Sequence, residues 1–464
     1  MDEITDWAED VFGCAELGDA RRTGRLVRMA AAAMRCPSGK ISQVYDSPAE
    51  RQGAYDFIES AAIDGRAIGQ AMAQSTARQC AVHEWVYVPL DGTSIKLWDG
   101  TGGRKDFGAI GTYANGATGL KLNSALAVSS DGVPLGVAAQ IWWSRPRKRE
   151  KPRRPSYKEP LESKETKHLL ACIDQVVESF SRHAPSTKCW FQMDRGCDAQ
   201  YVLLRLASSG HFFTVRSQSL RRVIRGGRRT IWLKSLLRRE AELGRFSLDL
   251  PKTEGRAARR ATVSVRSKSV TLQLRDKRKK KLFELQTNVV LVEEDGTCVD
   301  RVNWLLLTNH PTSSYEQALS VVGGYTQRWR IEEFHKTWKT DACNVEQTQL
   351  HSAERVMRWA TILAAVATRV EKLKRLARSS PDLDASVELT ASELEALALL
   401  KRRRKTATEK LPDRPDIATA TRWIAELGGY TGKSSGGPPG SITIARGLER
   451  LGIAAEILAL QKLR

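Results

Sequence analysis

Residues 85–91 read Trp-Val-Tyr-Val-Pro-Leu-Asp, an apolar run that closes on a carboxylate. Its β-branched and aromatic residues predict a buried strand. A second run of this kind, Cys-Trp-Phe-Gln-Met-Asp at 189–194, also ends on an aspartate. Between the two lie further strand patterns at 120–128 and 133–141, joined by a Ser-Asp-Gly hairpin signal at 130–132. The first half of the chain therefore contains a sheet in which two strands end on acids.

The elements that follow define the fold class. Helical periodicity predicts helices over about 163–182 and 199–208, and a strand over 212–215 comes next. The order is three strands, helix, strand, helix and strand. This is an α/β arrangement and specifically the opening of an RNase H-like mixed sheet. We expect the last helix of that fold in a long helix that begins near residue 315 and extends beyond 339.

A β-rich and strongly basic insertion, at about 217–300, separates the two parts of this core. Four short runs in it predict strands, at 262–265, 270–274, 282–286 and 289–292. Two basic clusters mark it: Arg221, Arg222, Arg225, Arg228 and Arg229 at its start, and Arg275, Lys277, Arg278, Lys279, Lys280 and Lys281 at a predicted loop tip. A charge run is usually solvated, but two clusters on one insertion favour phosphate contact. A strand at 304–308 returns to the main sheet.

Composition limits the partners of the chain. The 464 residues predict about three domains, at roughly 150 residues each. Lys and Arg number 74 against 53 Asp and Glu, and this net charge of +21 favours a polyanion, nucleic acid first. A membrane surface is the weaker alternative, because no apolar run approaches the roughly 20 residues of a membrane span. The acidic start has no secretory pattern, and the eight cysteines have no zinc-ligand spacing, so we expect a cytosolic protein with reduced cysteines.

Helical units are expected at both ends. Residues 1–75 read as an all-helical domain whose second helix opens at Asp19 with a basic face carrying Arg21, Arg22 and Arg25. Such a face suits a DNA groove, although a solvated helix surface is the alternative. Residues 76–370 would form the catalytic domain, and residues 371–464 a helical C-terminal domain.

The acids indicate metal chemistry. In an RNase H-like sheet, the strand ends that carry Asp91 and Asp194 lie side by side, and the last helix adds a carboxylate. Crowded carboxylates repel one another unless a cation compensates them. Ligation by oxygen alone favours Mg²⁺ or Mn²⁺ over zinc.

The third acid is expected on the segment 325–339, Tyr-Thr-Gln-Arg-Trp-Arg-Ile-Glu-Glu-Phe-His-Lys-Thr-Trp-Lys. At about 100° per residue, Tyr325, Arg328, Glu332 and Lys339 share one narrow stripe. Glu332 would hold the cation, while Arg328 and Lys339 grip phosphate. The alternative is a solvated helix with an Arg328–Glu332 pair.

Two further residues of this segment, Glu333 and Lys336, are candidates for the site. Glu333 falls off the stripe, which favours Glu332 as the ligand. Lys336 falls near the stripe and is a further candidate to face the substrate. Elsewhere, Asp198 lies one turn beyond Asp194, and capping of the next helix is favoured over a role as a second ligand.

Four stretches together resemble a known family: Asp91-Gly-Thr-Ser, Met-Asp-Arg-Gly-Cys-Asp at 193–198, Trp-Leu-Leu-Leu-Thr at 304–308, and the segment 325–339. They are similar to the DDE transposases of bacterial insertion sequences, and more narrowly to the Tn-five-type cut-and-paste group with the Y-(2)-R-(3)-E-(6)-K motif. The likeness runs from the first helices to about residue 370 and fades beyond it. One departure is Gly92, where many relatives have Thr.

The resemblance implies a catalytic triad of Asp91, Asp194 and Glu332 that binds two divalent ions, Mg²⁺ or Mn²⁺, for in-line displacement at phosphorus. It implies binding of double-stranded DNA at terminal inverted repeats, a nick at the element end, a hairpin made by the 3′-OH, reopening, and joining to target DNA. The C-terminal domain would form a homodimer in a synaptic complex. These steps would take place in the bacterial cytosol.

DNA contacts also follow from the resemblance. Tyr325, Arg328 and Lys339 match residues that contact phosphates near the element terminus. Trp304 matches a residue that stacks on a flipped base, with an ordinary core tryptophan as the alternative. Arg216 matches a further DNA contact, with a plain surface arginine as the alternative.

Two other functions fit parts of this pattern. A catalytically silent DNA-binding protein, such as a repressor or domesticated relative, would have no use for three crowded acids. A structure-selective nuclease on the same fold would cut DNA without joining it.

Overall fold

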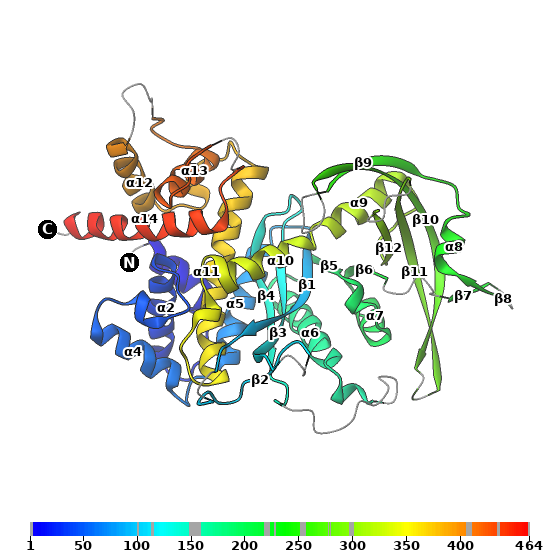
Figure 1. The fold of residues 1–464 in the computed structure, drawn as a ribbon, viewed down its shortest axis with the longest axis horizontal. Coiled ribbons are helices and arrows are strands. Elements are labelled where there is room, and N and C mark those ends of the chain that lie inside the picture. The colour runs from blue at the N-terminus through cyan, green and yellow to red at the C-terminus, as the bar shows by residue number, and fades with distance from the viewer. Residues whose placement is uncertain are drawn as a thin grey trace.

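The computed structural model describes residues 3–99, 102–112, 116–147, 159–217, 223–226, 229–250, 257–276, 278, 280–296, 301–404, 411–433 and 437–462. A mixed sheet forms the centre of the molecule (Figure 1). The insertion extends from one side of this sheet, and the helical units of both chain ends lie on the other side.

The core of the sheet has the strand order β4-β3-β1-β5-β6. Its strands are β1 (Trp85–Lys96), β3 (Thr118–Val128), β4 (Pro134–Trp143), β5 (Lys188–Met193) and β6 (Phe212–Arg216). β1, β5 and β6 are parallel to one another, and β3 runs antiparallel to both of its neighbours, β1 and β4. The predicted RNase H-like order is confirmed. The short β2 (Gly108–Ala109) extends the sheet beyond β3.

The length of β1 differs from the prediction. The apolar run stops at Leu90, but the strand continues to Lys96 because its second half still pairs with β3. β5 pairs with β1 only as far as Leu90 and Met193. Asp91 therefore lies inside β1, at the point where β5 ends. Alternation of side chains places Val86, Val88 and Leu90 in one core cluster and Tyr87 in the other.

Helices cover both faces of the sheet. α6 (Thr166–His183) and α7 (Gln200–Ala207) pack on the face of Val86, close to their predicted bounds. The opposite face is covered by α9 (Tyr315–Thr326), α10 (Trp329–Lys336) and α11 (Ala353–Ser379).

The insertion continues the core sheet. Its elements are β7 (Val223–Gly226), β8 (Arg229–Trp232), α8 (Leu233–Leu237), β9 (Gly244–Leu250), β10 (Arg259–Asp276) and β11 (Lys281–Glu294). All four predicted runs lie in strands, but their division into four short strands is wrong, because they form two long strands, β10 and β11, paired over most of their length. β12 (Asn303–Thr308) pairs with both β11 and β6, so it returns to the main sheet as predicted.

The two basic clusters of the insertion are described only in part. Arg221, Arg222, Arg228, Lys277 and Lys279 lie outside the described residues. Arg225 and Arg229 lie on β7 and β8, Arg275 and Lys281 lie at the facing ends of β10 and β11, and Arg278 and Lys280 lie in the turn between these strands.

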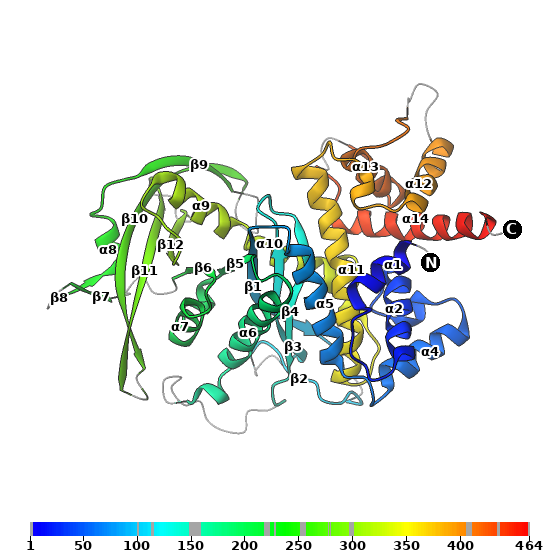
Figure 2. The same ribbon diagram turned by 180° about the vertical axis from the view of Figure 1, so that it is seen from behind.

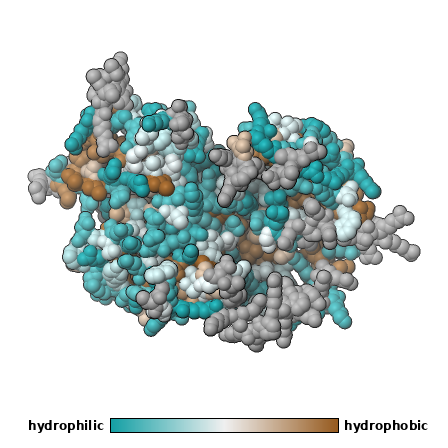
Figure 3. All heavy atoms as spheres, viewed as in Figure 1, coloured by the Kyte–Doolittle hydropathy of each residue, from teal (hydrophilic) through white to brown (hydrophobic). Residues whose placement is uncertain are grey.

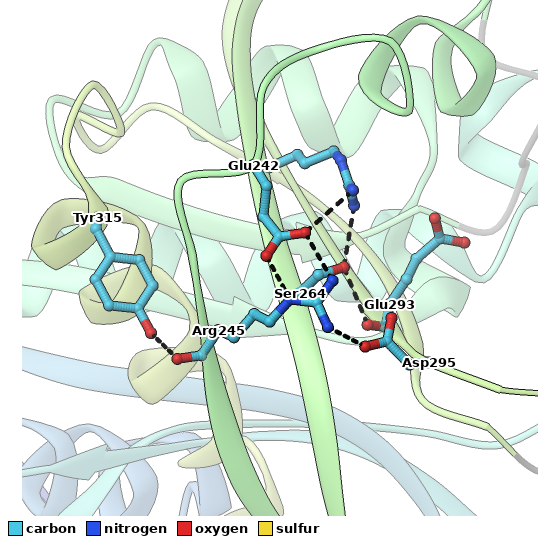
Figure 4. Close-up of polar contacts among 7 residues, drawn as sticks. Glu242, Arg245, Ser264, Glu293, Asp295 and Tyr315 are labelled. Atoms are coloured by element: carbon cyan, nitrogen blue, oxygen red, sulfur yellow. Dashed lines mark hydrogen bonds and ion pairs between the residues drawn. The ribbon is translucent and has the colours of Figure 1, made fainter.

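A polar network joins the insertion to α9 (Figure 4). Arg245 donates to Glu242 at 2.6 Å and also pairs with Asp295. Tyr315, at the start of α9, donates its hydroxyl proton to the backbone oxygen of Arg245 at 2.6 Å. A Cβ on Gly244 would meet the Tyr315 ring at 2.7 Å, so only glycine permits this approach. The insertion thus supports the helix that leads into α10.

The chain ends form two helical units that meet around α11. The N-terminal unit contains α1 (Glu3–Phe12), α2 (Ala20–Arg35), α3 (Ile41–Val44), α4 (Pro48–Glu59) and α5 (Gly65–Cys80). The C-terminal unit contains α12 (Ala391–Arg404), α13 (Ile417–Leu427) and α14 (Ser441–Lys462). Figure 2 shows α11 beside α5 and below α13, and most of its side chains are buried. The predicted domain limits after residues 75 and 370 fall inside α5 and α11.

Short helical turns complete the fold. They are η3 (Leu161–Ser163), η4 (Arg195–Cys197), η6 (Val345–Gln347) and η7 (Ala385–Val387), with a π-helical turn η5 (Thr337–Asp341) after α10. The cysteines among the described residues are free thiols. Within the same residues, no helix has the length and apolarity needed to cross a bilayer.

Candidate active site

Two aspartates come together because of strand register. Leu90 and Met193 are partners in the β1–β5 ladder, and Asp91 and Asp194 are the next residue of each strand. Alternation turns both away from the core cluster of Leu90 and Met193, toward the face that α10 covers. The predicted juxtaposition of these acids is present.

Backbone amides orient each carboxylate. Oδ1 of Asp91 accepts from the Gly92 N–H at 2.7 Å. Oδ1 of Asp194 accepts from the Gly196 N–H at 2.7 Å, which makes Asp194 the cap of η4. The second oxygen of each group is left for other partners.

Asp91 has a perturbed pKa. Burial, followed by the nearby charge of Asp194, raises the pKa of Asp91 from 3.8 to about 6, and Glu332 adds to the rise. The Gly92 amide and Arg328 act in the opposite direction. A carboxyl group that resists ionisation beside two other acids marks a site where a cation is favourable.

The helix that carries the third acid is not continuous, contrary to the prediction. α9 ends at Thr326, a turn at residues 327 and 328 follows, and α10 begins at Trp329. After Lys336 the chain winds into the π-helical turn η5, which carries Lys339. A constant 100° step therefore does not describe the path from Tyr325 to Lys339.

Arg328 lies between two of the acids. Its Nη2 is 2.6 Å from Oε1 of Glu332, and its Nη1 is 3.8 Å from Oδ2 of Asp91. Burial opposes its charge, but Tyr325, Glu332 and Asp91 together raise the pKa of its guanidinium. The predicted Arg328–Glu332 pair thus forms, and it forms within the site rather than in solvent, since the Arg328 side chain is only 14% exposed.

The neighbouring acid turns elsewhere. Glu333 pairs with Arg330 at 2.5 Å, near Arg375 of α11. Glu332 is therefore the glutamate that shares a partner with Asp91, as the helical stripe predicted.

Aromatic and basic side chains border the acids on the insertion side. Trp304 on β12 contacts Tyr325 edge to face, with ring centroids 5.3 Å apart. Arg216 ends β6, donates to the Asn303 oxygen at 3.2 Å and interacts with the Tyr325 side chain. Trp304 and Arg216 are half-buried, so each keeps part of its surface exposed.

The two lysines of the motif differ in position. Nζ of Lys339 donates to Oγ1 of Thr93 at 3.3 Å and lies 3.6 Å from Glu346. Thr93 follows Asp91 by two residues on β1, so Lys339 reaches the edge of the acid cluster. Lys336 instead extends into solvent, 72% exposed, and pairs with Asp341 at 3.4 Å.

The donor set is suited to a hard cation. Asp91, Asp194 and Glu332 offer only oxygen ligands, as Mg²⁺ and Mn²⁺ prefer. Among the described residues, no three acidic, histidine or cysteine side chains stand close enough to hold one ion in their present positions. Glu332 is instead bonded to Arg328. Burial and the neighbouring acids raise the pKa of Asp91, so its charged form is disfavoured while no cation compensates it.

Sequence reasoning missed or misjudged some neighbours. Asp198 does not cap α7, whose cap residue is Ala199, and instead accepts from the Ser217 hydroxyl at 2.9 Å. The buried Cys197 thiol lies near Asp194 and Asp91, and burial followed by these charges raises its pKa. The sequence did indicate this position, because Cys197 lies in the 193–198 stretch, three residues after Asp194.

The three arginines of α2 have different environments. Arg21 is exposed and pairs with Asp19 at 2.9 Å. Arg22 donates to the Leu17 oxygen at 3.0 Å, and the Arg25 guanidinium lies against Gly53 of α4. The last two therefore already support the N-terminal unit.

Three family models match successive parts of the chain. "Transposase DNA-binding" matches residues 4–63, "Transposase DDE domain" matches residues 162–369, and "Transposase Tn5 dimerisation domain" matches residues 365–460. The middle match contains Asp194 and Glu332 but begins after Asp91. Asp91 is placed in the site by the β1–β5 ladder, whose last pair is Leu90 and Met193, the residues directly before Asp91 and Asp194.

Proposed function

Because the chain belongs to the Tn5-type DDE transposases, we propose that this DNA-cleaving and strand-transferring enzyme acts at terminal inverted repeats. It nicks the element end, closes the end into a hairpin through the freed 3′-OH, reopens the hairpin and joins the end to target DNA. The reactions would take place on DNA in the bacterial cytosol.

The acids would supply the metal site. Asp91, Asp194 and Glu332 would hold two Mg²⁺ or Mn²⁺ ions, whose chemistry is to activate the attacking oxygen and to stabilise the leaving one. The protein fixes the two aspartates by strand register and by the amides of Gly92 and Gly196. The observation that carries the proposal is the juxtaposition of Asp91 and Asp194 at the end of the β1–β5 pairing, with Glu332 bonded to the same Arg328 that approaches Asp91.

The basic and aromatic border would hold the DNA. Arg328 and Lys339 flank the acids, where a guanidinium and an ammonium would grip the phosphates next to the scissile bond. Tyr325 would contact the same backbone. Trp304 would stack on a base extruded from the hairpin, and Arg216 would contact a phosphate nearby.

Other surfaces would serve the complex. Arg21 on α2 is exposed and would reach a groove by exchanging its ion pair with Asp19, and Lys336 projects outward beside the site. A stripe of exposed apolar residues, Ile453, Ile457 and Leu460, follows the outer end of α14 (Figure 3). Within the segment matched as a dimerisation domain, this stripe would pack against a second copy.

The test uses purified full-length protein and DNA that carries the element ends, taken from the sequence that flanks the gene. Asp91→Asn, Asp194→Asn and Glu332→Gln should each abolish Mg²⁺-dependent cleavage while DNA binding persists in a gel-shift assay. Glu333→Gln is the matched control, because Glu333 pairs with Arg330 away from the aspartates, and it should cleave like the wild type.

Each alternative gives a different result. A silent DNA-binding protein would bind the ends without cutting them. A structure-selective nuclease would cut, but its 3′-OH ends would not be joined to a target plasmid. Cleavage by Glu332→Gln at the wild-type rate would remove Glu332 from the proposed triad.

A further inference from the structure

A buried carboxylate connects the catalytic helix to the C-terminal unit. Glu371 lies on α11 and is only 2% exposed. Its Oε1 accepts from the Thr337 hydroxyl, from Nζ of Lys374 at 2.7 Å and from the Ser441 hydroxyl at 2.8 Å. A buried carboxylate is tolerated only when such donors compensate it, so the four side chains form one fixed unit.

The donors come from distant parts of the chain. Thr337 opens the π-helical turn η5, 34 residues before Glu371. Ser441 is the first residue of α14, 70 residues after it. Glu371 therefore joins the segment behind Glu332 to the helix that bears the exposed apolar stripe.

The π-helical turn depends on Thr337 twice. Its backbone oxygen accepts from the amides of Ala342 at 2.8 Å and Cys343 at 3.2 Å, and its hydroxyl is held by Glu371. The next residue, Trp338, is fully buried and donates its indole proton to the Ala360 oxygen on α11 at 2.9 Å. π-Helical turns of this kind occur frequently at functional sites.

The side chain that η5 aims is Lys339. It reaches across to Thr93 on β1, beside Asp91, although 246 residues separate the two partners. A regular α-helix through residues 337–341 would direct Lys339 differently, because each π-turn accommodates more residues than an α-turn.

We propose that Glu371 is a positioning residue for phosphate binding: it fixes η5 so that Lys339 points at the acid cluster, and it does so fully only when the start of α14 is seated on α11. The inference rests on the phosphate-binding role proposed above for Lys339. According to this inference, Lys339 takes its position beside the acids only when α14 of the same chain is packed on α11.

The sharpest variant is Thr337→Val, which removes one hydroxyl and keeps the side-chain volume. Thr368→Val is the matched control. Thr368 is buried like Thr337, but it lies on α11 and its hydroxyl donates to the Ala364 oxygen of the same helix. Hydrogen–deuterium exchange of the peptide covering residues 337–343 should rise in Thr337→Val and stay unchanged in the control. Ser441→Ala should raise exchange in the same peptide, although it lies on another helix.

Cleavage of element-end DNA then separates positioning from general stability. Thr337→Val should slow cleavage about tenfold, the scale of one lost hydrogen bond to a charged group. In a Lys339→Ala background the same substitution should have no further effect, because the side chain that it positions is gone. Equal slowing in both backgrounds, or unchanged exchange in Ser441→Ala, would overturn the inference.

The outcome also distinguishes this inference from the proposed function. If Lys339→Ala cleaves as fast as the wild type, the phosphate role of Lys339 is wrong and the inference falls with it. If Lys339→Ala is slow and Thr337→Val is not, only the inference is overturned.

Discussion

Replacing Asp91 by asparagine should stabilise the metal-free protein, although it should destroy activity. Burial and the neighbouring acids raise the pKa of Asp91 from 3.8 to about 6. The folded protein therefore retains a proton up to about pH 6 that the unfolded chain releases near 3.8. Stability falls as pH rises through this window, and the penalty is complete above about pH 6.

The size of the effect follows from the shift. A difference of about 2 pH units at 1.36 kcal/mol each gives about 3 kcal/mol at pH 8, and the side chain is buried enough for the shift to count in full. At pH 5 the same expression gives about half of this value. For a chain of 464 residues that unfolds in one transition, the unfolding entropy converts about 3 kcal/mol into roughly 3 °C of Tm.

The assay is differential scanning fluorimetry of Asp91→Asn and wild type in EDTA at pH 5 and pH 8. Asparagine should raise Tm by about 3 °C at pH 8 and by about half as much at pH 5. A gain that is absent at pH 8, or equal at the two pH values, would falsify the account of the acid cluster.

Glu165 provides a control of opposite sign. Although burial raises its pKa, hydrogen bonds from Arg145 and Lys121 lower the pKa of Glu165 to about 2. A lowered pKa contributes stability above about pH 4.5 that is lost only as pH falls toward 2. Glu165→Gln should therefore lower Tm at both pH 5 and pH 8.

Three further outcomes are expected. Glu393→Gln removes the nearer of two charge partners of the buried Arg369 guanidinium and leaves Glu388 at 3.5 Å, so it should cost about 3 kcal/mol in urea unfolding; an unchanged midpoint would refute a stabilising role for the Arg369–Glu393 pair. Tyr315→Phe removes the hydrogen bond to the Arg245 oxygen and should lower the free energy of unfolding by about 1 kcal/mol in the same assay. An unchanged free energy would mean that water replaces this hydrogen bond at no cost. Trp304→Ala should slow hairpin formation more than the first nick, as gel-resolved time courses would show, and equal slowing of both steps would assign Trp304 a structural role only.

The acidic part of the site was predictable from sequence. Each aspartate directly follows an apolar run, and parallel pairing of those runs brings Asp91 and Asp194 together whatever the exact strand ends. The wrong end predicted for β1 does not change the position of Asp91, because strand register and side-chain alternation determine where Asp91 points. Helical spacing likewise separated Glu332 from Glu333 within one turn, over which the helix is regular.

Charge and composition did not predict which basic side chains are available to bind DNA. The excess of Lys and Arg indicates a polyanionic partner, but it does not say which arginines are available. Arg22 and Arg25 are engaged within the N-terminal unit, whereas Arg21 is exposed. The same uncertainty applies to Lys336, which the helical stripe placed near the substrate and the fold directs toward Asp341. Only contacts between elements decide these cases.

The basic side of the site could not be predicted because its geometry is not local. The path from Glu332 to Lys339 passes through a π-helical turn, and no residue pattern in 325–339 distinguishes that turn from a regular helix. Its supporting contacts, Glu371 and Ser441, lie in a part of the chain where the family resemblance seen in the sequence fades. Strand pairing fixes the two aspartates, whereas the position of Lys339 follows from η5, which we propose is held by its contacts to α11. Substitutions in the C-terminal unit should therefore change the position of Lys339, and with it the proposed phosphate binding, before they disturb the aspartates.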